Sequence, residues 1–256
     1  MYDLAAFSQA DMQRCAITLR NLDERSQSME ETANRIVRHL YENLINQQTG
    51  EKACALVRFF KTHPYGDLDA DLQEAAQAIL KGRNILRATR CLTLLATAGD
   101  EPYWNDRQES IGHQAIPLID QDFVYRAPMI LQLIQQFGLE VSAVIDTAPT
   151  LITKVAHKAF NVFHVPDAIG SPHIPAQTQF VLPYQVQSVL GFGGMLPSGS
   201  LFAVILFSKV PIPVETANRF RWISAYVRIA TESFDRGKVF ASDRRVLTPK
   251  LQEVRF

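Results

Sequence analysis

The sequence has no excess of charge of either sign, and it lacks long hydrophobic runs. Lysine and arginine together number 26, as do aspartate and glutamate, so no global field attracts nucleic acid or an anionic membrane. No apolar run approaches the roughly 20 residues of a membrane-spanning helix. The first fifteen residues also lack the charged, apolar and small-residue order of a signal peptide. We therefore expect a cytoplasmic protein that binds neither nucleic acid nor membrane.

Cysteine and metal-ligand patterns are also scarce. Cys15, Cys54 and Cys91 form no Cys-x-x-Cys pair and have no histidine beside them, so we expect reduced, buried thiols. The six histidines show no metal-ligating spacing, and no Gly-x-Ser-x-Gly elbow marks a serine nucleophile. The sequence thus predicts no metal site and no catalytic residue, and it leaves any cofactor unknown.

The glycine-rich residues 191–194 raise the question of a phosphate site. The position of the third glycine in a dinucleotide-binding fingerprint is Leu196, which is followed by a proline and not by a helix. No Gly-Lys-Ser/Thr ending of a phosphate-binding loop is present either. Residues 186–196 and 201–209 have the composition of strands, and residues 197–200 have turn chemistry between them. We therefore expect a β-hairpin.

Apolar side chains recur at alternating spacings of three and four over residues 12–40. This heptad pattern predicts a long helix within residues 1–48 that pairs with its copy in a parallel coiled-coil homodimer. The residues expected at the dimer seam are Cys15, Leu19, Leu22, Met29, Ile36 and Leu40. The alternative is two helices, broken near residues 23–28 and folded onto the core of the same chain.

Other segments predict a mixture of strands and helices. Strands are expected at residues 53–60, 90–97 and 113–118, and helices at residues 67–82, with Asp67 as the cap, 129–137 and 214–234. Residues 236–256 are mixed in composition, and we expect them to be mobile or loosely packed. The pattern is typical of one α+β domain.

Residues 104–107 combine an aromatic ring with hydrogen-bond donors, which suits a small anionic ligand. The plainer interpretation is a loop held by a buried tryptophan. His164 and His173 have the chemistry of axial haem ligands and could converge across a proline-rich segment, although a lone histidine more often has a structural hydrogen bond. The candidate ligand-binding residues are Trp104, Asn105, Arg107, His113, His164, His173, Tyr184 and Gly193.

Residues 184–230, YQVQSVLGFGGMLPSGSLFAVILFSKVPIPVETANRFRWISAYVRIA, resemble the closing half of a GAF domain. In that family a strand, a turn, a second strand, a short linker and a long amphipathic helix follow in this order. Together with the upstream segments, the likeness to the sensory regions of bacterial two-component proteins covers about residues 29–234.

This resemblance implies a GAF-like α+β fold with a central antiparallel sheet flanked by helices. It implies a signalling helix at residues 1–48, a sensor domain at 49–235 and a tail at 236–256. The implied function is a homodimeric signal-sensing domain that binds a small ligand and regulates a histidine kinase or another signalling module.

Departures from better-known GAF domains restrict the kinds of ligand that we expect. Cys91 is followed by leucine and not by the histidine of a bilin attachment site, and the Asn-Lys-Phe-Asp-Glu signature of cyclic-nucleotide binding is missing. No ATP site of a histidine kinase is found. GAF folds also include a free methionine sulfoxide reductase, so an enzyme that uses Cys54 or Cys91 remains an alternative. A dimerisation module without a ligand is a third possibility.

Overall fold

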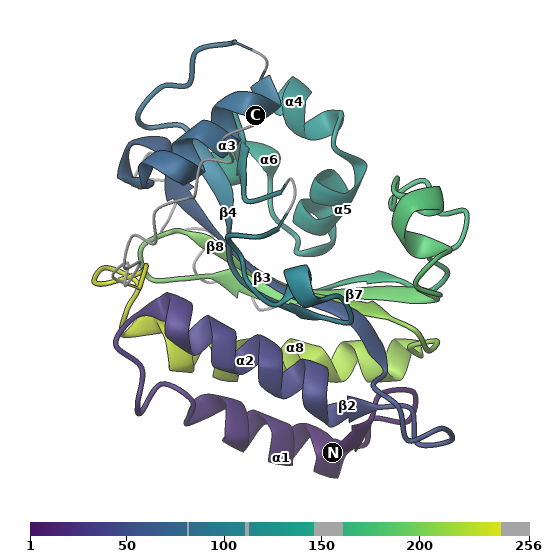
Figure 1. Ribbon diagram of the computed structural model, residues 1–256. Coiled ribbons are helices and arrows are strands. Elements are labelled where there is room, and N and C mark those ends of the chain that lie inside the picture. Colours follow the sequence, from purple (N-terminus) through teal and green to yellow (C-terminus); the bar gives the residue numbers. More distant parts are fainter. Residues whose placement is uncertain (81, 111–112, 146–160, 242–256) are drawn as a thin grey trace, which may run out of the picture.

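A six-stranded antiparallel sheet forms the centre of the computed structural model, in the order β5-β4-β3-β8-β7-β6 (Figure 1). The structure describes residues 1–80, 82–110, 113–145 and 161–241. The strands are β3 (Cys54–Pro64), β4 (Arg90–Gly99), β5 (Ala115–Pro117), β6 (Asn161–Val165), β7 (Ser188–Met195) and β8 (Leu201–Ser208). The predicted α+β class is confirmed, and the helix-flanked antiparallel sheet is consistent with the expected GAF-like arrangement.

Helices cover both faces of the sheet (Figure 1). One face, the α8 face, carries α1 (Gln9–Arg20), α2 (Met29–Asn43) and α8 (Val214–Glu232). The opposite face, the α5 face, carries α4 (Gln121–Tyr125), α5 (Pro128–Gln136) and α6 (Val141–Ile145), while α3 (Ala70–Leu80) packs beside β5. Short elements complete the fold: β1 (Tyr2–Asp3) paired with β2 (Leu44–Ile45), the 3-10 turns η1 (Tyr65–Asp67) and η2 (Pro102–Trp104), and the π-helical turn η3 (Gln177–Val181).

The predicted long N-terminal helix is wrong, and the alternative of two helices is confirmed. Ser28 breaks the pattern because its side chain caps α2 by accepting a hydrogen bond from the Glu31 backbone N–H. The side chains assigned to the dimer seam face the core of their own chain: Cys15, Leu19, Met29, Ile36 and Leu40 are fully buried, and Leu22 packs against them. They therefore do not form the seam of a coiled coil.

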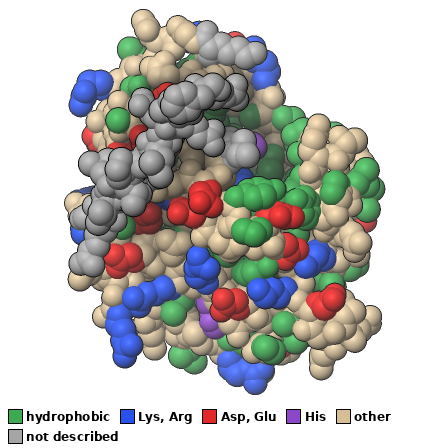
Figure 2. Space-filling model, in the orientation of Figure 1, with side chains coloured by type: hydrophobic (Ala, Val, Ile, Leu, Met, Phe, Trp, Pro, Cys, Tyr) green, Lys and Arg blue, Asp and Glu red, His purple; other side chains and the backbone are tan. Residues whose placement is uncertain are grey.

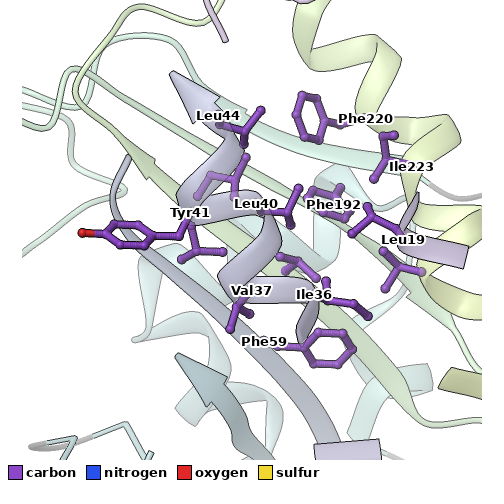
Figure 3. Packing of buried hydrophobic residues seen from close by; sticks show 14 of the residues in the cluster. Leu19, Ile36, Val37, Leu40, Tyr41, Leu44, Phe59, Phe192, Phe220 and Ile223 are labelled. Atoms are coloured by element: carbon purple, nitrogen blue, oxygen red, sulfur yellow. The ribbon is translucent and has the colours of Figure 1, made fainter. Parts of the chain in front are cut away.

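In the core on the α8 face, side chains from the N-terminal helices pack together with side chains from the C-terminal helix α8. Figure 3 shows Leu19 of α1 and Ile36 of α2 in the same apolar cluster as Phe192 of β7 and Phe220 of α8. Each of these side chains is fully buried, and such burial contributes about 1.5 to 3 kcal/mol for a large apolar residue. This packing explains how the apolar side chains of α1 and α2 are buried without a second chain.

Several local predictions are confirmed with adjusted boundaries. β7 and β8 form the expected hairpin, and Gly199 in its turn adopts a φ of +80°. The strands and helices predicted over residues 53–137 and 214–234 are present. The cap of α3 is Asp69 and not Asp67, because the Asp69 carboxylate accepts the Leu72 N–H while Asp67 belongs to η1.

Residues 236–241, here called the C-terminal strap, are packed against the domain. The Met29 and Glu30 N–H groups donate to the carbonyls of Lys238 and Val239 at 3.1 and 2.8 Å. The Phe240 ring lies 5.1 Å from the ring of His63. These six residues of the expected tail thus have specific contacts with the domain, and residues 242–256 lie outside the described part. Across the described ranges, no helix is long and apolar enough to cross a membrane.

Candidate functional site

An aromatic cluster on the α5 face contains two of the predicted ligand-binding residues. The ring of Trp104 lies 4.5 Å from that of Tyr184 and 5.5 Å from that of Phe180, between ring centroids. Phe180 in turn contacts Phe207 of β8 at 5.0 Å. A Cβ on Gly99 would come within 2.8 Å of the Trp104 ring, so the indole lies directly on β4. The structure thus brings Trp104 and Tyr184 together as part of the core.

Asn105 and Arg107 are used within the chain. The Asn105 amide donates to the carbonyls of Gly99 and Glu101 at 3.0 and 2.8 Å, which closes the loop after β4. Arg107 Nε and Nη2 donate to the two carboxylate oxygens of Glu30 at 2.7 and 3.2 Å, and both residues are buried. Both side chains thus have partners within the chain, which agrees with the plainer interpretation of this loop.

His164 and His173 are not brought together by any described contact. Phe163 and Val165 point into the core of the α5 face, so His164 between them faces the α8 side. Its Nε2 is buried and has no partner among the described residues. His173 lies in the loop after β6, where its backbone N–H donates to the Ser171 hydroxyl.

Gly193 has a packing role. A Cβ at this position would lie 2.1 Å from the carbonyl oxygen of Phe202 and 3.0 Å from the ring of Phe137. No side chain fits there without moving the backbone of β8. The glycine-rich strand therefore allows close approach of two strands, in agreement with a hairpin and not with a phosphate loop.

A polar row that the sequence analysis missed lies on the α5 face of the central strands. Arg58 of β3 is opposite Thr97 of β4 and Ile205 of β8. Its Nη2 donates to the hydroxyl of Ser110 at 3.0 Å. Among the described residues, Arg58 Nε and Thr97 Oγ1 are buried without any hydrogen-bond partner. We refer to Arg58, Thr97, Ser110 and the nearby His113 as the Arg58 site.

The charge of this site comes from one group. Burial lowers the pKa of Arg58 to about 10, which still leaves the guanidinium cationic at neutral pH. The pKa of His113 is lowered, first by loss of hydration around the ring and then by the positive charge of Arg58, so the imidazole is neutral at that pH. Of the six ion pairs between described residues, none includes Arg58. A single, partly buried positive charge thus lies among apolar side chains, beside the hydroxyl of Thr97, which has no hydrogen-bond partner among the described residues.

One sequence signal could have revealed this site. In the strand segment ACALVRFF, Arg58 falls on the same side as Leu56 and Phe60, whose side chains both belong to the core of the α5 face. A charged residue at an inward position of a central strand is rare unless it is paired or functional. Thr97 and Ser110 give no comparable signal.

Two open hollows lie elsewhere on the surface. One of about 370 Å³ lies between α3 and the loop after β4 and includes Asp69, Asp71, Glu74 and Arg107 in its wall. The other, of about 670 Å³, lies beside η3 and is lined by residues such as Asp167, Leu182 and Gln185. The described residues contain no group of three side chains placed to hold a metal ion. Figure 2 shows positive and negative side chains interspersed over the visible face.

Comparison with known proteins gives likenesses of structure only. No protein-family model matches the sequence, and no curated protein matches it. The free methionine-R-sulfoxide reductase from Neisseria meningitidis, solved in complex with its substrate, is similar with a TM-score of 0.47 and 10% identity, over 92% of this chain and 98% of that one. The chromophore-binding domain of an unusual bacteriophytochrome from R. palustris is similar with a TM-score of 0.38 and 8% identity, over 90% of this chain and 64% of that one.

Proposed function

We propose that this chain is a GAF-like sensory domain that binds a small ligand at the Arg58 site and regulates a signalling partner. The observation that carries the proposal is the partly buried polar row on the α5 face, in which Arg58 Nε and Thr97 Oγ1 lack a described partner. Burying a charge or a hydroxyl without a partner is costly, and such costs are commonly retained where a protein binds something. The partner is a histidine kinase or another signalling module, and we place the protein in the cytoplasm.

A chain of contacts connects this site to the two ends of the domain. Ser110, which accepts the hydrogen bond from Arg58, belongs to the same loop as Arg107. Arg107 binds Glu30 at the start of α2, and the Glu30 carboxylate also accepts the N–H of Ala241 in the C-terminal strap at 3.0 Å. Movement of this loop on ligand binding would therefore change the contacts of α2 and of the strap.

A homodimer remains part of the proposal, but with a different surface from the predicted seam. The outer side of α8 exposes Trp222 and Ile229, whose side chains are 64% and 44% accessible. Exposed large apolar side chains on one helix are a common feature of protein interfaces. A second copy of the chain is the partner that we expect on this side.

The test is native mass spectrometry together with an absorbance spectrum of freshly purified protein. A dimer that carries a reproducible additional mass supports the proposal and gives the class of ligand. A metabolite screen by thermal shift extends the test to weak ligands. If neither method finds any ligand, the sensory function is refuted and a structural dimerisation module becomes the better interpretation.

The enzyme alternative requires an accessible thiolate. Cys15, Cys54 and Cys91 are fully buried, and burial raises the pKa of each thiol to about 12. A thiol in this state is a poor nucleophile at neutral pH. Turnover of free methionine sulfoxide that is lost in Cys54→Ser or Cys91→Ser would favour the enzyme over the sensor.

A further inference from the structure

The surroundings of Arg58 restrict the chemistry of what it can bind. Along the α5 face, one row of paired residues runs from Phe163 of β6 through Gly191 and Ile205 to Arg58 and Thr97. The three residues on the β6 side of Arg58 are apolar. The polar end of the row consists of a guanidinium and a hydroxyl on adjacent central strands.

Two buried cations among the described residues are paired with carboxylates. Arg107 forms a two-point pair with Glu30, and Lys61 lies 3.5 Å from a carboxylate oxygen of Asp235. Buried Arg90, in contrast, has only neutral partners among the described residues: it donates to the carbonyl of Gly199 at 3.1 Å, and its Nε has no hydrogen-bond partner there. Arg58 likewise has only the neutral hydroxyl of Ser110, so no described group compensates its positive charge. Unlike Arg90, the Arg58 side chain is only partly buried.

We propose that Arg58 binds the carboxylate of a small ligand that carries one negative charge, an inference that rests on the proposed sensory function. A carboxylate matches the planar fork of a guanidinium and is the natural partner for its unpaired Nε. The Thr97 hydroxyl on the neighbouring strand supplies a second donor. Only one charge is required, because Arg58 is the one cation of the site.

The first experiment measures the thermal unfolding of Arg58→Met without added ligand. Replacing a partly buried charge that has no described counterion by an apolar side chain of similar length should leave Tm unchanged or raise it. Arg126→Gln, a change on the exposed surface after α4, is the control for the loss of one arginine. A clear fall of Tm in Arg58→Met alone would mean that Arg58 has a structural partner, and it would overturn the inference.

The second experiment measures binding of acetate, propionate and benzoate, each compared with its uncharged amide, by calorimetry and by the shift of Tm. We expect at least one carboxylate to bind the wild type about tenfold or more tightly than its amide, and Arg58→Met to lose that difference. Arg126→Gln should retain it. If no carboxylate is preferred over its amide, the inference is overturned.

The two proposals fail in different ways. A neutral molecule that copurifies equally with wild type and Arg58→Met overturns the carboxylate inference and supports the sensory function. A protein that binds no carboxylate of the panel and no metabolite in the thermal-shift screen overturns both. A copurifying carboxylic acid that is absent from Arg58→Met supports both.

Discussion

Glu30 and Arg107 form a buried two-point ion pair between segments that are 77 residues apart in the sequence. The pair fixes the start of α2 to the loop after β4, and the same carboxylate accepts a backbone N–H of the C-terminal strap. Three parts of the chain that are distant in sequence therefore depend on one carboxylate.

Loss of this pair should be strongly destabilising. Arg107→Gln leaves the Glu30 carboxylate buried without its cation, which typically costs about 3 to 5 kcal/mol. Arg83→Gln is the matched control, because its pair with Asp120 at 3.3 Å is exposed and should contribute less than about 1 kcal/mol. Urea unfolding measures both. Equal effects of the two substitutions would contradict the central role given to Glu30.

A methyl group at Gly193 should also destabilise the protein. Gly193→Ala would place its Cβ against the backbone of β8, and overpacking of a core typically costs about 1 to 3 kcal/mol or more. Gly237→Ala is the control, since its nearest neighbours lie 4.0 Å away. Thermal unfolding of the two variants measures the difference. An unchanged Tm in Gly193→Ala would show that the strands can separate slightly without loss.

The position of Leu19 distinguishes an internal helix from a coiled-coil seam. Leu19→Ala removes a fully buried side chain and should lower the free energy of unfolding by about 2 to 5 kcal/mol. Ile17→Ala on the same helix, where the side chain is 60% exposed, should change it by less than about 0.5 kcal/mol. The loss at Leu19 should not depend on protein concentration. A loss of stability that depends on protein concentration would instead support Leu19 as part of a coiled-coil dimer seam.

The protein should lose stability on mild acidification because of His63. Burial, and then the nearby charge of Lys61, lower the pKa of His63 well below 6.5, so the unfolded chain binds the proton more readily. Stability contributed by the neutral ring is present above the unfolded pKa and falls as the pH drops below it, by at most about 1.4 kcal/mol per pH unit. Urea midpoints from about pH 7.5 down to about pH 5 measure the slope. His63→Gln should flatten it, and parallel curves for the two proteins would refute this assignment.

The three thiols should be unreactive in the native protein. Their burial and raised pKa values predict slow modification by an aromatic disulfide reagent, with complete reaction only after unfolding in urea. Thiol titration under both conditions gives the comparison. Rapid native modification of Cys54 or Cys91 would instead support the redox enzyme.

Sequence reasoning succeeded where the signal was local. The hairpin depends on turn residues that include Gly199, and the helices after residues 128 and 213 depend on the periodicity of nearby side chains. The heptad pattern was misleading because spacing shows that a stripe is buried and not what buries it. Here the partners of Leu19 and Ile36 lie far away in the sequence, in β7 and α8.

The candidate site was harder to predict for a similar reason. Trp104 and Tyr184 were named and do meet, but Asn105 and Arg107 are used for internal bonds that no pattern in the sequence indicated. Arg58 was visible as a charge in an apolar strand. Its significance depends on the absence of a described partner, which only the fold reveals.

The shared core of α1, α2 and α8 also affects how the chain is made. A ribosome releases the N-terminal helices long before α8, which begins at Val214. Until then the apolar sides of Leu19, Ile36 and Leu40 have no permanent cover on the nascent chain, a state in which chaperones commonly bind. Closure of the α8 face is therefore a late step of biosynthesis, although the central hairpins can pair earlier.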